Sequence, residues 1–136
     1  MKVSSKSEHA LHAMLYIAAK GDRMSTINEV AEQELIPREY LAKILKELSM
    51  KGFLKSYKGI LGGYKLAKVP QKISFLNIIE AMDGPLSVIS CANDTHIKAG
   101  KPRRKYCMAQ IFWIPLQDKL RDAMANMTLD KINDIK

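Results

Sequence analysis

Between residues 26 and 68, two short helical patterns run directly into a hairpin whose tip is rich in glycine. Thr26 and Glu29 have the spacing of a capping box, which marks the start of a first helix that ends near Gln33. Pro37 suits the first position of a second helix. The apolar stripe of this second helix consists of Leu41, Ile44, Leu45 and Leu48. The turn between the two helices has the length that packs them as a helix-turn-helix.

The hairpin is predicted from two runs of alternating residues, 53–57 and 63–67. Gly59, Gly62 and Gly63 lie where a tight hairpin tip needs a permissive backbone. A helix-turn-helix followed by such a hairpin has the order of parts of a winged helix-turn-helix. The second helix of the motif is then the one that enters the major groove, so this segment predicts DNA binding.

Apolar residues at helical spacing predict three further helices outside this motif. One spans residues 5–20, with Ser5 and Glu8 in capping-box spacing, and another spans residues 74–82. A long helix from residue 107 to about residue 127 carries an apolar stripe that a small winged domain cannot cover alone. The simplest partner for that stripe is the same helix of a second subunit. Residues 86–106, which include glycine, proline and five lysines or arginines, are expected to form a functional loop.

The chain of 136 residues suffices for one compact core, predicted to be mainly α with a small β-hairpin wing. We expect a DNA-binding domain at residues 1–84, a sensor loop at 85–106, and a dimerisation helix with a short C-terminal helix at 107–136. The 22 lysines and arginines outnumber 14 acidic residues, and the formal net charge of +8 suits a polyanionic partner. Without an apolar leader or a membrane-length apolar stretch, the expected location is cytoplasmic and no membrane contact is expected.

Four stretches, at residues 4–6, 62–67, 78–84 and 127–129, and the order of the predicted elements resemble the Rrf2 family of bacterial transcription regulators. The resemblance covers essentially the whole chain. It departs at the wing tip, residues 59–62, where the family usually has a glycine run that contains proline. The resemblance implies a homodimer on palindromic double-stranded operator DNA, with the second helix of the motif in the major groove and the wing in the minor groove.

The resemblance also implies which side chains contact the operator. Ser5 and Lys6 correspond to phosphate contacts, and Lys58 corresponds to a minor-groove contact. The residues that face the major groove are Arg38, Glu39, Tyr40 and Lys43. The expected DNA-binding residues are Ser5, Lys6, Thr26, Arg38, Glu39, Tyr40, Lys43 and Lys58. The family often has arginine at the position of Lys58, and lysine keeps the charge without the planar fork. For each of these residues, an ordinary solvated surface position is the alternative.

Cluster-binding members of the family usually carry three cysteines in the sensor loop, whereas this chain has only Cys91 and Cys107. Glu8 and His12 lie four residues apart on the first helix, so they share one face and can supply a second pair of ligands. These four residues match the RsrR-type branch of the family, in which the glutamate and histidine reach across from the partner subunit. The resemblance therefore implies a redox-active [2Fe-2S] cluster, bound between subunits by these four residues, that controls operator binding.

Other interpretations of the same residues stay open. The glutamate and histidine also fit a capping box with an ordinary helical neighbour, and the four side chains suit a single Zn²⁺. Cys91 and Cys107 can instead form a reversible disulfide in a cofactor-free repressor. His9 and His96 are expected to be solvated. A winged helix used only for protein contacts is a further alternative. Nothing in the sequence supports an enzyme, since it offers neither a nucleophile paired with a base nor a phosphate-binding loop.

Overall fold

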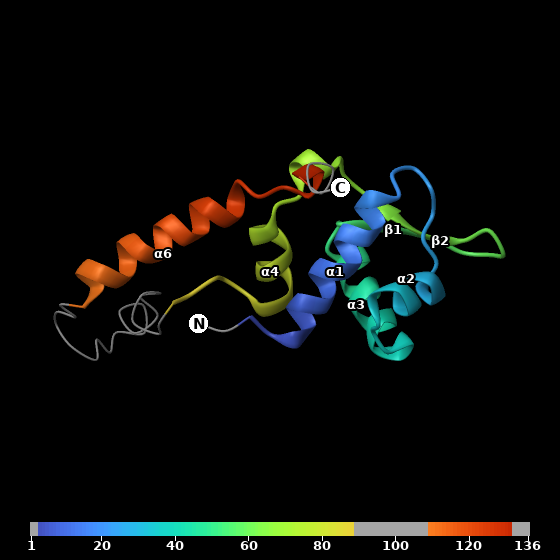
Figure 1. The fold of residues 1–136 in the computed structure, drawn as a ribbon, viewed down its shortest axis with the longest axis horizontal. Coiled ribbons are helices and arrows are strands. Elements are labelled where there is room, and N and C mark those ends of the chain that lie inside the picture. The colour runs from blue at the N-terminus through green and yellow to red at the C-terminus, as the bar shows by residue number, and fades with distance from the viewer. Residues whose placement is uncertain (1–2, 89–108, 132–136) are drawn as a thin grey trace.

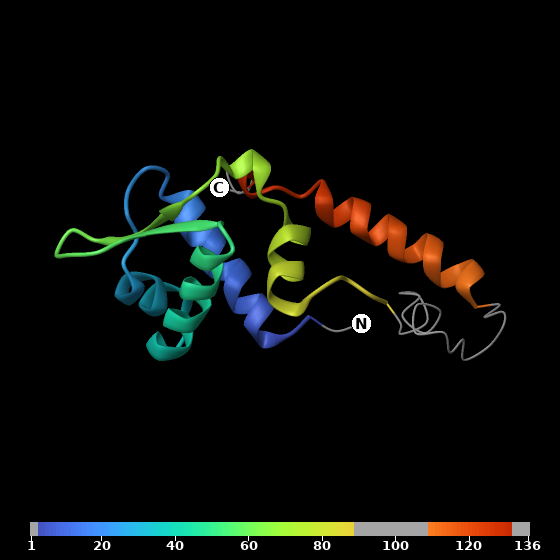
Figure 2. The same ribbon diagram turned by 180° about the vertical axis from the view of Figure 1, so that it is seen from behind.

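The computed structural model describes residues 3–88 and 109–131, in which helices dominate and one two-stranded antiparallel hairpin projects outward (Figure 1). In chain order the elements are α1 (Ser5–Ala19), α2 (Ile27–Glu34), α3 (Arg38–Met50), β1 (Leu54–Tyr57), β2 (Gly63–Leu66), the 3-10 turn η1 (Pro70–Lys72), α4 (Phe75–Asp83), α6 (Gln110–Ala125) and the 3-10 turn η3 (Leu129–Lys131). The hairpin and α6 lie at opposite ends of the molecule (Figures 1 and 2). The predicted mainly helical fold with a hairpin wing is confirmed. Among the described helices, none is long and apolar enough to cross a membrane.

Helix α1 lies at the centre of the packing and contacts α2, α3, α4, β2 and η3. Its fully buried apolar residues recur at helical spacing and form one face: Ala10, Ala13, Met14 and Ile17. The surrounding elements contribute further buried residues to the same core, among them Val30, Leu41, Leu45, Leu48 and Ile78. One side of α1 therefore positions the elements around it, and the other side faces solvent.

Helices α2 and α3 are joined by a tight turn that begins with a left-handed backbone. Leu35 has φ 55° and ψ 46° and is 87% exposed. At the other end of α2, the Thr26 hydroxyl accepts a hydrogen bond from the Glu29 amide at 3.1 Å, and the Thr26 amide donates to the Glu29 carboxylate at 2.8 Å. This confirms the predicted capping box. Helix α3 begins at Arg38, so Pro37 immediately precedes the helix instead of being its first residue.

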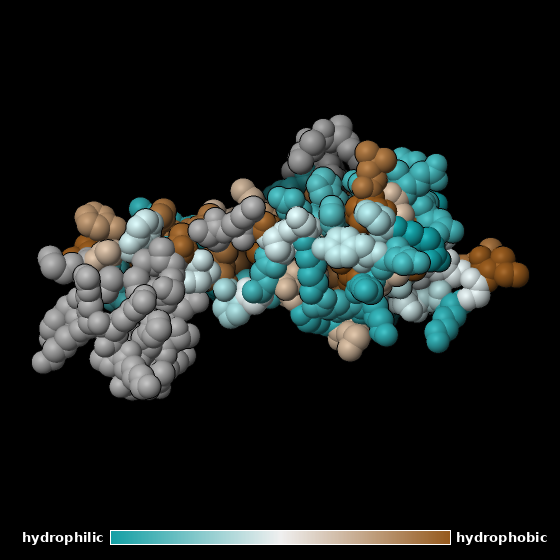
Figure 3. All heavy atoms as spheres, turned by 90° about the horizontal axis from the view of Figure 1, so that it is seen from below, coloured by the Kyte–Doolittle hydropathy of each residue, from teal (hydrophilic) through white to brown (hydrophobic). Residues whose placement is uncertain are grey.

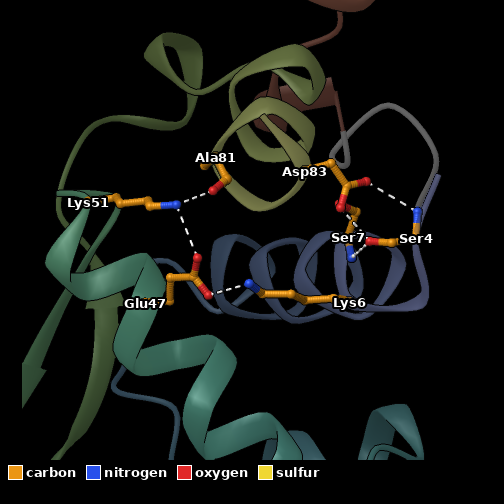
Figure 4. Close-up of polar contacts among 7 residues, drawn as sticks. All are labelled: Ser4, Lys6, Ser7, Glu47, Lys51, Ala81 and Asp83. Atoms are coloured by element: carbon orange, nitrogen blue, oxygen red, sulfur yellow. Dashed lines mark hydrogen bonds and ion pairs between the residues drawn. The ribbon is translucent and has the colours of Figure 1, made fainter. Parts of the chain in front are cut away.

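The start of α1 is determined by a contact with the end of α4 (Figure 4). Ser4 is the capping residue, because its hydroxyl oxygen accepts a hydrogen bond from the Ser7 amide at 3.1 Å. Ser4 also donates twice to Asp83, from its amide at 3.2 Å and from its hydroxyl at 2.5 Å. The predicted capping box of Ser5 and Glu8 is therefore wrong by one residue, since the long-range contact with Asp83 selects Ser4.

The wing is anchored to the helix-turn-helix by backbone hydrogen bonds. Its strands pair in a register that places Tyr57 opposite Gly63. Ser25, in the loop before α2, exchanges two backbone hydrogen bonds of 3.0 and 2.8 Å with Tyr64 of β2. Glycine is needed at position 63, because a Cβ there would lie 2.7 Å from the Ser25 carbonyl oxygen. The hairpin is thus held close to α2 by contacts of β2 next to the turn.

Helix α6 packs on α4 through its C-terminal half. Met124 and Leu120 join a second core with Leu76, Ile79 and Leu86, and Arg121 makes a 2.5 Å ion pair with Glu80. Apolar side chains in the first half of α6 remain exposed: Ile111, Phe112, Ile114 and Leu116. As predicted, the described part of the chain does not cover all of the apolar surface of this helix. Beyond α6, Leu129 is buried in the core around α1.

Replacement of Leu35 by glycine should stabilise the fold, because glycine adopts a left-handed backbone without the penalty that a β-carbon imposes. We expect the free energy of unfolding to rise by about 0.5–1 kcal/mol, as measured by urea denaturation followed by circular dichroism. Leu35→Ala is the matched control, since alanine removes the same exposed side chain but retains the backbone penalty. A loss of stability in Leu35→Gly would show that the leucine side chain makes a stabilising contact.

Candidate nucleic-acid interface

The solvent-facing side of α3 carries charged residues at helical spacing. Glu39, Lys43 and Lys46 are exposed at successive turns of the helix. Arg38 is exposed at the start of α3, where its Nε donates a 2.6 Å hydrogen bond to the Asn28 side-chain oxygen of α2. The structure thus brings three of the four predicted major-groove residues together. Lys46 was not predicted, although the same helical spacing continued by one turn identifies it.

Tyr40, the fourth predicted residue of this face, is half-buried. Its ring meets the His9 ring of α1 edge to face, with ring centroids 5.4 Å apart and planes at 82°. His9 is itself half-buried, and its Nδ1 atom is buried without a hydrogen-bond partner in the described part of the chain. The expectation that His9 is solvated is therefore wrong, because α3 packs against α1 at this point. His96 lies outside the described residues.

The first turn of α1 presents Ser5 and Lys6, the predicted phosphate contacts. Ser5 is exposed, whereas Lys6 is half-buried and its Nζ lies 2.6 Å from the Glu47 carboxylate of α3. Lys51 pairs with the same carboxylate at 3.0 Å and donates a hydrogen bond to the Ala81 carbonyl oxygen of α4 (Figure 4). Glu47 therefore joins two ammonium groups and, through them, links the start of α1 to the C-terminal ends of α3 and α4.

Thr26 is exposed at the start of α2, and its hydroxyl oxygen is occupied by the capping box. The hydroxyl proton remains available to donate to an external acceptor. Glu29 also accepts hydrogen bonds from Arg23 and Tyr16, each at 2.8 Å. Burial raises the pKa of Glu29, but the hydrogen bonds from Thr26, Arg23 and Tyr16 outweigh it and lower the pKa. The ionised carboxylate thus holds the N-terminus of α2 in place.

Three lysines lie on the wing, two of them exposed and one, Lys65, half-buried. Lys55 and Lys65 lie directly opposite each other in the antiparallel pair, and Lys58 is exposed just beyond β1. Lys65 Nζ lies 5.8 Å from the centroid of the Tyr57 ring. Like charges in directly opposite positions repel each other, and a bound polyanion relieves that repulsion. The wing therefore presents positive charge next to the helix-turn-helix.

Glu8 and His12 are exposed on α1, one turn apart and on the side opposite its buried face. His12 Nδ1 lies 3.4 Å from the Glu34 carboxylate of α2, and the His12 side chain is 61% exposed. A carboxylate beside Nδ1 favours the tautomer with its proton there, which leaves Nε2 as an electron-pair donor. Cys91 and Cys107 lie outside the described residues. Within the described ranges, no three or more histidine, cysteine or acidic side chains form a group that could hold a metal ion.

Comparison with known proteins agrees with this geometry. The family model for Rrf2, described as an iron-dependent transcriptional regulator, matches residues 3–134. The chain belongs to the Rrf2 family. This Rrf2 protein is a DNA-binding transcription regulator and not an enzyme.

Relatives of this Rrf2 chain match it over all or nearly all of its length. A protein of Aquifex aeolicus assigned as an HTH-type transcriptional regulator is 32% identical over 136 residues, which are 100% of this chain and 94% of that protein. The structure of CymR, the global cysteine regulator of B. subtilis, matches with a TM-score of 0.83 at 24% identity, covering 100% of this chain and 98% of that one. The oxidised form of Staphylococcus aureus CymR matches with a TM-score of 0.73 at 27% identity, over 95% of this chain and 93% of that one.

The Glu47 carboxylate should make the stability of this Rrf2 protein depend on pH. Hydrogen bonds from Lys6 and then from Lys51 hold the pKa of Glu47 below its usual value. Ionised Glu47 therefore favours the folded state above its unfolded pKa of about 4.3. That contribution is lost as the pH falls through the lowered pKa.

We expect Glu47→Gln to lower the free energy of unfolding at neutral pH by up to about 1 kcal/mol, and the difference from wild type to vanish in acid. Urea denaturation at a series of pH values measures both effects. Glu32→Gln, which removes the same charge from an exposed position on α2, is the matched control. If the difference in stability between Glu47→Gln and wild type persisted unchanged in acid, the ionised carboxylate would not be its cause.

Proposed function

We propose that the protein is a homodimer that regulates transcription by binding palindromic operator DNA. The observation that carries the proposal is the exposed charged stripe of α3 beside a lysine-lined wing. Arg38 can make paired hydrogen bonds to guanine in the major groove, and Glu39 can accept one from cytosine. Tyr40 and Lys43 complete this face of the protein. Base contacts by α3 then determine which sequence is bound.

The remaining contacts in this proposal go to the DNA backbone and to the minor groove. Ser5, Thr26 and Lys6 donate to phosphate oxygens. The ammonium group of Lys6 has three N–H donors, so its pair with Glu47 leaves others for a phosphate. Lys58 enters the minor groove. The phosphate contacts place α3 in the groove and carry no sequence information of their own. Lys58 responds only to the shape of the minor groove.

The dimer is proposed to form through α6. Ile111 and Phe112 are 70% and 76% exposed, and Leu116 is 49% exposed. A contact between two copies of this helix buries the same residues of both subunits and produces two-fold symmetry. A two-fold protein requires a two-fold operator. The corresponding organisation is a DNA-binding domain at residues 1–84, a sensor loop at 85–106 and a dimerisation region at 107–136.

A redox-active [2Fe-2S] cluster, as in the RsrR-type branch, is proposed to control operator binding. Glu8 and His12 of one subunit and Cys91 and Cys107 of the other would hold it. The description of the family as iron-dependent supports an iron cofactor. A bound cluster supplies one reversible electron at this position.

The described half of this ligand set fits the proposed role. Glu8 and His12 face outward at one-turn spacing, and Glu34 beside His12 Nδ1 leaves Nε2 free to bind a metal. The same helix packs on α3 through the contact of His9 with Tyr40. A displacement of α1 at its outward-facing residues therefore reaches the helix that contacts the bases.

A cofactor-free or Zn-binding repressor with a thiol–disulfide switch is the second candidate. The likeness to Staphylococcus aureus CymR, which has a structure in an oxidised form, favours it. In this case Cys91 and Cys107 form a reversible disulfide and sense oxidants directly. Glu8 and His12 are then ordinary surface residues of α1, unless a zinc ion occupies the four side chains.

Operator binding should depend strongly on Lys43. We expect Lys43→Ala to weaken binding about tenfold, because a good groove contact contributes roughly 1–3 kcal/mol. Fluorescence anisotropy with a palindrome selected by the wild-type protein from a random library measures this loss at several salt concentrations. Lys119→Ala, which removes the same charge from an exposed position on α6, should leave affinity nearly unchanged. A binding affinity that depended neither on the salt concentration nor on the palindromic symmetry of the duplex would indicate a winged helix used for protein contacts.

The cluster proposal can be tested by complementation between two defective subunits. One variant carries Glu8→Ala with His12→Ala, and the other carries Cys91→Ala with Cys107→Ala. Each homodimer should lack visible charge-transfer absorption. The heterodimer, purified through two different tags, should regain about half of the wild-type absorption, since one of its two symmetry-related sites has all four ligands. Iron and sulfide counts on anaerobic protein provide the second measurement.

The outcomes of this test separate the candidates. A colourless heterodimer beside brown wild-type protein would show that the ligands do not come from two subunits. Colourless wild-type protein after cluster assembly in vitro would contradict the cluster. Mass spectrometry that detects a disulfide between Cys91 and Cys107, which alone changes operator binding, would establish the thiol switch.

A further inference from the structure

The wing tip has two aliphatic side chains at the centre of its turn. The Gly62 amide donates a 3.0 Å hydrogen bond to the Gly59 carbonyl oxygen, so Ile60 and Leu61 are the two central residues of a β-turn. Ile60 is 102% exposed and Leu61 is 88% exposed. Proline, asparagine, aspartate and glycine are the usual residues at such positions, because they favour the turn conformation. Turn formation therefore does not explain why isoleucine and leucine occur here.

The backbone presents these two side chains outward from an anchored arm. A Cβ on Gly62 would lie 2.2 Å from the Tyr57 carbonyl oxygen, so the turn closes tightly on the end of β1. The other strand is held by the two hydrogen bonds between Ser25 and Tyr64. Figure 3 shows the tip as an apolar end that projects beyond the surface around it. Little reorganisation is then needed for the tip to enter a groove.

The charges around the tip favour nucleic acid over protein as its partner. Between Glu47 and Glu80 the sequence contains no acidic residue, and its lysines there are Lys51, Lys55, Lys58, Lys65, Lys68 and Lys72. Lys55 and Lys65 oppose each other on the wing, and Lys58 precedes the turn directly. Phosphates line both edges of the minor groove of DNA, whereas a protein surface of mixed charge offers no such match.

We propose that Ile60 and Leu61 form an apolar wedge that enters the minor groove of the operator and opens a base step. The inference rests on the proposed binding of the wing in the minor groove and adds a determinant of specificity to it. Apolar side chains that enter this groove partly unstack a base step and bend the duplex. The deformation is easiest at flexible pyrimidine–purine steps. The tip therefore selects operators by the flexibility of the step that it meets, without hydrogen bonds to the bases.

The test compares wild-type protein with the double variant Ile60→Ser and Leu61→Ser on a palindromic duplex that the wild-type protein selects from a random library. Energy transfer between fluorophores at the two duplex ends measures the bend, and anisotropy measures affinity. We expect the double variant to bind about tenfold more weakly and to lose the bend. The salt dependence should stay the same, because the lysines of the wing remain.

A second arm of the test examines the operator. Each TA or CA step of the selected duplex is replaced by AA, one symmetric pair at a time. One such pair should weaken wild-type binding about tenfold, as expected for a position read through deformation. The same replacement should leave the double variant unaffected, because its tip no longer opens the step.

Val69→Ser removes an exposed aliphatic side chain outside the tip and is the matched control for both arms. Equal binding and bending by the double variant, or an unbent duplex with wild-type protein, would overturn the wedge and leave operator binding intact. If the double variant bound the operator normally but no longer regulated transcription in a purified assay, the tip would be assigned to a protein partner. That result would also overturn the wedge. Wild-type protein that showed no salt-dependent DNA binding would instead contradict the proposed function.

Discussion

The burial of one face of α1 is the constraint on which the rest of the molecule depends. Ala10, Ala13, Met14 and Ile17 are fully buried, and α2, α3, α4 and the wing all pack around the helix that carries them. Because a helix repeats every 3.6 residues, the same helix places Glu8 and His12 on the opposite side. The residues proposed to bind a cofactor and the core that orients α3 are therefore two faces of one rigid element.

Electrostatics divides the surface of this molecule into paired and unpaired cations. Near the start of α1, Glu47 pairs with Lys6 and Lys51 and so joins α1, α3 and α4. On the wing, by contrast, Lys55 and Lys65 face each other directly and the neighbouring sequence has no carboxylate. The first arrangement stabilises the fold, whereas the second leaves a repulsion that a polyanion can relieve. One basic chain thereby combines ion pairs that stabilise its fold with a wing whose charge suits a polyanion.

The two ends of the molecule expose apolar side chains in different arrangements. At the α6 end, Ile111 and Phe112 are exposed on the first half of a helix whose other half packs on α4. This leaves an apolar stripe that the same helix of a second subunit can cover. At the wing end, Ile60 and Leu61 occupy a small turn surrounded by lysines. An extended apolar stripe suits a partner helix, whereas two side chains on a basic arm suit a narrow groove.

The sequence by itself determined the helix-turn-helix, the wing, the charged stripe of α3 and the uncovered surface of α6, because helical periodicity, capping residues and glycines act over a few neighbouring residues. Only the tertiary structure decided the contacts between distant segments. Asp83 selects Ser4 instead of Ser5 as the cap of α1, and α3 covers His9 with Tyr40. The ion pair of Lys6 with Glu47 and the burial of Leu129 in the core around α1 are likewise contacts between distant segments. Such contacts depend on which surfaces meet after folding, and no local pattern in the chain specifies that meeting.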